Sequence, residues 1–185
     1  MIMKSDNWQG PLIASLFSGA ILYSVFIFLE KEKWYKKLLV EKEPGEIKKS
    51  ILMLFMIFSV MVVIAWELCQ KPFIISTSIL MWGMGDGTAA LVGVPFGKHK
   101  VNLKGTDDKK SWEGSISMLL VSFLFDILSL INCSSMPLLH MTIVVMIGSF
   151  LGTATELFTS GKYDTATVPI VITISFLVLE YIWKY

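Results

Sequence analysis

Acidic residues inside strongly apolar stretches are the first feature of this sequence that could do chemistry. These acids are Glu67, Asp86, Glu113, Asp126, Glu156, Asp164 and Glu180. A carboxylate inside or beside a hydrocarbon phase is energetically costly, so such residues mark functional sites by default. Two uses fit them, which are holding a divalent cation and accepting a proton from a substrate.

Asp86 has the most distinctive surroundings of these acids. It lies in the stretch Gly83-Met84-Gly85-Asp86-Gly87, where the glycines allow the backbone to kink or to approach a ligand closely. A carboxylate at such a point can hold Mg²⁺. A seam of small residues that packs helices around one buried acid would give the same pattern. The motif alone therefore leaves both interpretations open.

A lysine-rich segment, residues 94–114, follows this motif. It contains Lys98 and Lys110 and ends in Ser-Trp-Glu-Gly at 111–114, which is typical of a helix start. The free N–H groups and the positive dipole end of a helix start favour phosphate. Together, the acid, the glycines and the lysines favour a site for a nucleotide with Mg²⁺.

The elements that must position these residues are membrane helices. The chain has 185 residues, 54% of them hydrophobic and 17% charged, and its mean hydropathy is +0.66. This composition excludes most soluble classes and argues against nucleic-acid binding. We expect one polytopic all-α domain over residues 1–185, with about six transmembrane helices. The expected spans are 11–29, 50–69, 72–94, 115–131, 137–158 and 167–183.

Lysine distribution predicts the orientation of these spans. The connections after spans one, three and five contain 13 of the 16 lysines, and the chain has no arginine. The positive-inside rule then places both termini outside and these three connections in the cytoplasm. Asp86, Glu113, Glu156 and Asp164 would gather on that cytoplasmic side. Glu67 and Glu180 would lie at outer span ends, whereas Asp126, deep in span four, fits a partnered buried acid and a catalytic group equally well.

Four pieces of the sequence, in order, resemble a known family. They are Gly85-Asp86-Gly87-Thr88-Ala89-Ala90-Leu91-Val92-Gly93, Phe96-Gly97-Lys98-His99-Lys100, Lys110-Ser111-Trp112-Glu113-Gly114-Ser115, and Ala154-Thr155-Glu156-Leu157 with Asp164 and Val168-Pro169. This set, within residues 82–170, is similar to the membrane-embedded CTP-dependent lipid kinases: phytol and farnesol kinases, dolichol kinase and CTP-dependent diacylglycerol kinase. Where that family usually has Asn after the last acid, this chain has Thr165. Its members commonly also begin with an extra Arg-Lys-x-x-His-like segment, which nothing before Ser50 matches.

The resemblance and the residues together imply phosphoryl transfer from a nucleotide to a lipid alcohol. Phytol, farnesol, geranylgeraniol, a polyprenol and diacylglycerol are all candidate acceptors, entering from the inner leaflet. CTP as the donor is implied by the resemblance alone. We assign Mg²⁺ to Asp86 and Asp164, catalysis to Asp86, Glu113 and Glu156, and nucleotide binding to Gly85, Gly87, Lys98, Lys110, Ser111 and Gly114.

Two other functions remain as alternatives. Phosphatidate cytidylyltransferases, which make CDP-diacylglycerol, share the Phe-Gly-Lys and Lys-x-x-Glu-Gly elements, but their C-terminal signature is absent from this sequence. A small non-enzymatic transporter would explain intramembrane acids and a span broken by glycines, but it predicts acids along both leaflets. We expect a multi-pass protein of a bacterial or archaeal cell membrane or a eukaryotic endomembrane. Its active site would face the cytoplasm, and homo-oligomer formation is left open.

Overall fold

The computed structural model describes residues 7–32, 35, 45–103, 106, 110–134, 136–159 and 163–183. The helices in these ranges are α1 (Gln9–Leu29), α3 (Glu46–Met61), η2 (Val62–Leu68), α4 (Pro72–Phe96), α5 (Trp112–Cys133), α6 (Leu138–Phe158) and α7 (Asp164–Trp183). The part of the chain described contains no β-strand. Six segments are long and apolar enough to cross a membrane, which confirms the predicted all-α, multi-pass architecture.

Local sequence signals set several of the helix ends. Pro72 occupies the first turn of α4, where its missing N–H costs nothing. Gly45 begins α3 with a φ of 76°, a conformation that favours glycine. Ser111 is the N-cap of α5, and its side chain accepts a hydrogen bond from the backbone N–H of Gly114. The predicted helix start at 111–114 is therefore present.

The expectation of a broken helix at the glycines around Asp86 is wrong. α4 continues without interruption from Pro72 to Phe96, through Gly83, Gly85 and Gly87. Breaking the helix inside a membrane would leave backbone groups without partners, and nothing in the glycines themselves forces that break. The irregular segment lies elsewhere, in η2, where residues 62–68 form a π-helix. The transporter alternative thus loses the broken span on which it partly rested.

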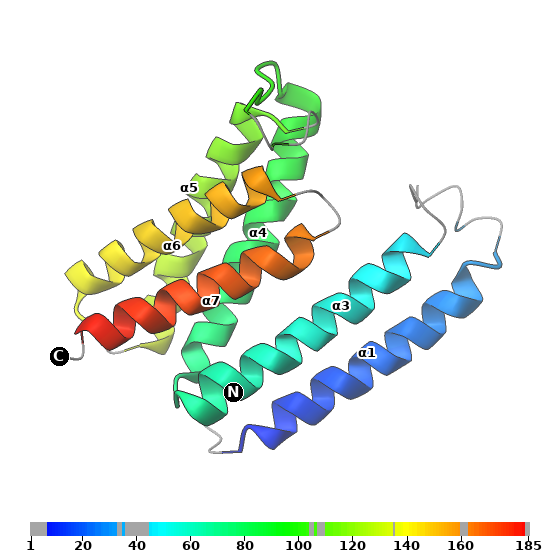
Figure 1. Ribbon diagram of the computed structural model, residues 1–185, viewed down its shortest axis with the longest axis horizontal. Coiled ribbons are helices and arrows are strands. Elements are labelled where there is room, and N and C mark those ends of the chain that lie inside the picture. The colour runs from blue at the N-terminus through cyan, green and yellow to red at the C-terminus, as the bar shows by residue number, and fades with distance from the viewer. Residues whose placement is uncertain are drawn as a thin grey trace.

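The helices associate as neighbouring pairs (Figure 1). α1 lies beside α3, α4 lies beside α5, and α6 lies beside α7. The α4–α5 pair has the most extensive contact, and α6 and α7 pack against it. The largest buried cluster joins these elements through residues such as Met81 of α4, Met118 of α5 and Phe176 of α7.

Polar interactions at one end of the bundle link α7 to neighbouring segments. Lys71, just before α4, forms an ion pair with Glu180 of α7. His140 of α6 stacks on Trp183 of α7 with ring centroids 5.1 Å apart. Glu180 was expected as an interfacial acid, and here it has a lysine partner, whereas Glu67 is exposed. The residues around Lys110, Glu156 and Asp164 lie at the opposite ends of these helices.

Asp126 is the most deeply buried acid in the bundle. Its side chain is 0% exposed, and neither carboxylate oxygen has a hydrogen-bond partner within the described residues. Its neighbours on α5 do have partners in α4, since Ser122 Oγ donates to Met81 O at 3.0 Å and Ser129 Oγ lies 3.4 Å from Thr77 Oγ1. The sequence left two interpretations of Asp126 open. The described residues do not support the first one, a buried acid with a hydrogen-bond partner.

We predict that Asp126→Asn stabilises the protein. The substitution keeps the shape of the side chain and removes an acid that must give up its charge to be buried without a partner, so the free energy of unfolding should rise by about 1–3 kcal/mol. The measurement is thermal or denaturant unfolding in detergent at neutral pH. Ser122→Ala, one turn away, is the matched control and should lower stability by about 1 kcal/mol because it removes a satisfied hydrogen bond. A less stable Asp126→Asn would contradict this account.

Candidate functional site

Glycines bring α4 and α5 into backbone contact at the end of the pair that carries the Gly-Asp-Gly and Ser-Trp-Glu-Gly motifs. A Cβ atom at Gly114 would lie 3.0 Å from Ala89 O, and one at Gly93 would lie 3.1 Å from Ser111 Oγ. Both distances are tighter than side chains normally tolerate. Gly93 and Gly114 therefore allow an approach that larger residues would prevent.

The segment between α4 and α5 folds back onto the start of α5. Val101 N donates to Lys110 O at 3.1 Å, and Trp112 N donates to His99 O at 3.0 Å, which forms an antiparallel bridge between Lys100 and Ser111. The N–H groups of Trp112 and Gly114 are thus already bonded within the protein. The predicted phosphate cradle at this helix start has fewer available donors than the sequence indicated.

Glu113 holds this segment in place. Its carboxylate accepts the backbone N–H groups of Lys98 at 3.2 Å and His99 at 3.1 Å, and it lies 2.6 Å from His99 Nδ1. Glu113 does not line the cavity described below. The structure therefore places this sequence-predicted catalytic residue in a positioning role, where it fixes the return of the chain to the membrane.

A cavity of about 270 Å³ lies where α4, α5, α6 and α7 meet, and we call it the site cavity. The residues that line it are Asp86, Ala89, Ala90, Gly93, Val94, Lys110, Ser111, Gly114, Ser115, Glu156 and Asp164. It brings together six of the site residues named from the sequence: Asp86, Lys110, Ser111, Gly114, Glu156 and Asp164. These residues are up to 78 positions apart in the chain, so only the fold makes them neighbours.

The other predicted site residues lie outside the site cavity. Gly85 is buried, and a Cβ atom there would overlap Ser122 Oγ, so this glycine serves helix packing. Gly87 faces open space, with nothing within 4 Å of a Cβ atom. The Lys98 side chain is exposed in the segment after α4. The seam interpretation of the Gly-Asp-Gly motif is thus correct for Gly85, while Asp86 itself faces the cavity.

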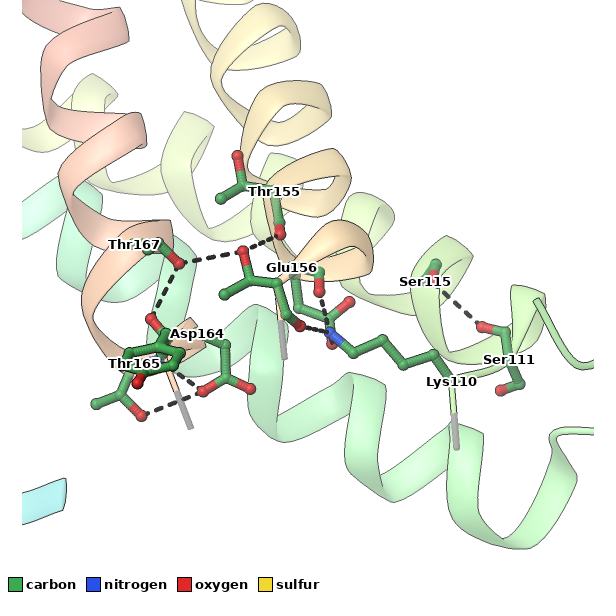
Figure 2. A network of polar contacts seen from close by, with 10 residues as sticks. Lys110, Ser111, Ser115, Thr155, Glu156, Asp164, Thr165 and Thr167 are labelled. Atoms are coloured by element: carbon green, nitrogen blue, oxygen red, sulfur yellow. Dashed lines mark hydrogen bonds and ion pairs between the residues drawn. The ribbon is translucent and has the colours of Figure 1, made fainter. Parts of the chain in front are cut away.

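Lys110 and Glu156 form the central polar contact of the site (Figure 2). Lys110 Nζ lies 2.9 Å from Glu156 Oε1, and both side chains are largely buried. The same ammonium donates to Glu156 O and, at 2.9 Å, to Thr159 O. Lys110 therefore neutralises an acid and also caps the carbonyl groups at the C-terminal end of α6.

Asp164 begins α7 on the other side of Glu156 (Figure 2). Its Oδ1 atom accepts the backbone N–H of Thr165 at 2.6 Å and lies 3.3 Å from Thr165 Oγ1. A separate contact joins α7 to the end of α6, where Thr167 Oγ1 donates to Thr159 Oγ1 at 3.3 Å. Thr165 stands where the family that this sequence resembles usually has Asn. Its hydroxyl contacts the Asp164 carboxylate.

The charges in the site cavity fit a divalent cation that arrives with phosphate. Its lining holds three carboxylates and one lysine, which leaves an excess of negative charge. Nothing among the described residues donates a hydrogen bond to the Asp86 carboxylate, so its oxygens remain available to a ligand. In the same ranges, no three acidic, histidine or cysteine side chains converge as a ready metal centre. Mg²⁺ is commonly held by one or two carboxylates plus substrate phosphates, which is what Asp86 and Asp164 could offer.

Sequence reasoning missed the residues that shape the cavity without bearing charge. Ala89, Ala90, Gly93 and Ser115 line it, and only their small size is functional there. A usable signal was present, because Ala89 and Gly93 follow Asp86 at helical spacing, on nearly the same face of α4.

Comparison with known proteins gives a consistent result. The chain is 32% identical over 115 residues to a phytol kinase of Synechocystis sp., an alignment that covers 60% of this chain and 47% of that protein. It is 29% identical over 116 residues to a probable phytol kinase of Zea mays, covering 63% of this chain and 36% of the relative. A phytol kinase of Arabidopsis thaliana is 41% identical over 64 residues, or 35% of this chain and 20% of the relative.

The similarity is limited in extent. The aligned region spans about half or less of the length of each of these relatives. No family profile matches the chain, and no solved structure matches it significantly. Within those limits, the similarity to cyanobacterial and plant phytol kinases supports the resemblance found in the motifs.

Proposed function

We propose that this protein transfers the γ-phosphoryl group of a nucleoside triphosphate, CTP by its resemblance, to a lipid alcohol of the phytol or prenol class. The observation that carries the proposal is the site cavity, which joins Asp86, Glu156, Asp164 and Lys110 at one end of a bundle of membrane helices. An alcohol on an apolar chain can reach such a position from the bilayer. The lysine distribution favours the cytoplasmic face, where nucleotides are available.

Each cavity residue then has a distinct task. Mg²⁺ held by Asp86 and Asp164 would supply positive charge to the β- and γ-phosphate oxygens. Lys110 is placed to balance charge between Glu156 and the phosphates. The Glu156 carboxylate, held in orientation by Lys110, is the candidate for receiving the alcohol proton.

The reaction balances without any further reactant. The alcohol oxygen forms a bond to the γ-phosphorus, and the bond from that phosphorus to the oxygen bridging to the β-phosphate breaks. The nucleoside diphosphate leaves with the electron pair of the broken bond, and the alcohol proton passes to Glu156. Because the protein contributes mainly position and charge, the spacing of the acids around the cavity matters more than the chemistry of any single residue.

We predict that Asp86→Asn abolishes most activity without unfolding the protein. Losing this carboxylate should lower kcat by about 10²- to 10³-fold, because charge stabilisation in the transition state is lost. The assay combines purified protein, Mg²⁺, γ-labelled CTP or ATP, and a panel of phytol, farnesol, geranylgeraniol, a polyprenol and diacylglycerol. Asp126→Asn is the matched control, since it removes an acid outside the site cavity and should retain wild-type turnover. Full activity in Asp86→Asn would refute the site, and no label on any alcohol would refute the kinase proposal.

Glu156→Gln should separate proton transfer from binding. We expect kcat to fall by about 10²- to 10⁴-fold, the usual contribution of a general base, while the nucleotide KM changes little. Glutamine can still accept a hydrogen bond from Lys110, so the fold should persist, and a thermal melt checks this. An equal loss of kcat and of nucleotide affinity would mean that Glu156 holds the nucleotide instead.

Replacing two lysines should distinguish the site cavity from the exposed segment before it. Lys110→Gln removes charge-assisted hydrogen bonds worth roughly 1.5–3 kcal/mol, so we expect a lower melting temperature and a nucleotide KM raised by about one to two decades. Lys98→Gln is the matched control, because Lys98 is exposed and outside the cavity lining, and it should change neither quantity. Equal effects of both substitutions on KM would indicate a general electrostatic patch.

A further inference from the structure

A second cavity, of about 260 Å³, lies between α5 and α6 near the same end of the bundle. Its wall is apolar, and we call it the apolar groove, defined by Trp112, Ile116, Phe150, Thr153, Ala154 and Leu157. Trp112, Ile116 and Phe150 are also exposed on the surface of the bundle, so the groove opens toward the surrounding hydrocarbon. A chain of the bilayer phase can therefore enter it from the side.

The apolar groove adjoins the site cavity. Ser115 of α5 lines both cavities, so only this small side chain and its immediate neighbours separate them. On α6, Thr153 lines the groove and Glu156 lines the site cavity, three residues further along the helix. Positions three apart lie next to each other on a helix surface. A molecule with an apolar chain in the groove would thus have its polar end beside Glu156.

The Thr153 hydroxyl is buried behind the wall of the groove and is not part of its surface. The side chain of Thr153 is only 8% exposed, and Oγ1 has no hydrogen-bond partner within the described residues. Neighbouring threonines of the same helix behave differently, because Thr155 Oγ1 donates to Leu151 O at 2.7 Å and Thr159 Oγ1 donates to Thr155 O at 2.7 Å. A buried hydroxyl without a partner costs about 1–3 kcal/mol. The surface that the groove itself offers a ligand is apolar throughout, which suits a hydrocarbon chain.

The size of the groove limits how much of a ligand it can hold. Pockets that enclose most of a small molecule usually measure about 300–1,000 Å³. At about 260 Å³, the groove can hold only part of a long chain, and the remainder would stay in the bilayer. Selectivity would then depend on the carbons nearest the hydroxyl and only weakly on total chain length.

From these observations we propose that the apolar groove binds the hydrocarbon chain of a single-chain lipid alcohol over the segment next to its hydroxyl. Ser115, which lines both cavities, marks the passage from the groove to the site cavity and Glu156. The identity of the ligand as an alcohol rests on the proposed function. The location of the groove and its apolar wall do not.

Photolabelling tests binding without requiring activity. Wild-type protein in lipid nanodiscs is irradiated with a farnesol analogue that carries a diazirine near its hydroxyl, and the labelled peptides are mapped by mass spectrometry. We expect label at Ile116, Phe150 and Ala154, reduced by excess farnesol but unaffected by an alkane of equal length. Label spread evenly over lipid-exposed positions such as Leu120 and Ile174 would overturn the proposal as ordinary bilayer contact. A groove that takes no label, because another helix or a second copy of the chain covers it, would also overturn it.

Substitution in the groove tests its role in turnover. Ala154→Phe fills the groove, so the KM for farnesol should rise at least tenfold while the nucleotide KM stays unchanged. Leu151→Phe places the same aromatic side chain on the same helix outside the groove and should leave both values as in the wild type. Thr153→Val removes a buried hydroxyl that the groove does not expose, so it should leave the farnesol KM as in the wild type. An unaltered farnesol KM in Ala154→Phe would contradict the proposal.

The two arms separate this inference from the proposed function. If the wild type phosphorylates no alcohol but farnesol competes for label in the groove, the kinase proposal fails and the binding site stands. If the wild type is active but neither the labelling pattern nor the farnesol KM depends on the groove residues, the kinase proposal stands and the groove inference fails.

Discussion

Close approach of α4 and α5 is the constraint on which the rest of the site depends. Where these helices meet, a Cβ atom at Gly93 or Gly114 would be crowded by its neighbours, and Ser111 lies close to both glycines. This contact fixes the start of α5 against the last turns of α4, and it thereby sets the distance between Asp86 on one helix and Lys110 beside the other. In a membrane, where apolar side chains gain little by leaving lipid, such small-residue contacts are a principal source of helix association.

The close contact of α4 and α5 also determines how the charges in the site cavity are arranged. Lys110 emerges from the segment that α5 holds in place and reaches the C-terminal end of α6, where it meets the Glu156 carboxylate and two backbone carbonyl groups. One cation thus joins the start of α5 to the end of α6 and offsets one of the three acids in the site cavity. The remaining negative charge has no counterpart among the lining residues, and this imbalance favours a ligand that brings positive charge with it.

The sequence allowed the membrane helices and most of the cavity acids to be predicted, because both depend on short-range patterns. Apolar runs of sufficient length indicate spans, and acids within them are rare enough to be informative. Glu113 and Gly85 were placed in the site because motif position does not tell which face of a helix a side chain occupies. Glu113 in fact binds the backbone of Lys98 and His99, and Gly85 packs against Ser122. The pairing of Lys110 with Glu156, 46 residues apart, depends on the tertiary arrangement, which spacing alone does not contain.

The π-helix at Val62–Leu68 bears on how this chain can vary in length. A π-turn takes up one residue more than an α-turn while leaving the helix on either side in phase. Val62, Ala65 and Trp66 of this segment are buried in the core, so their orientation matters for packing. A homologue lacking one residue here would form a regular α-helix and present the same faces on both sides. This segment is therefore the place in the bundle where a single-residue insertion or deletion can be absorbed without rearranging the helices around the cavity.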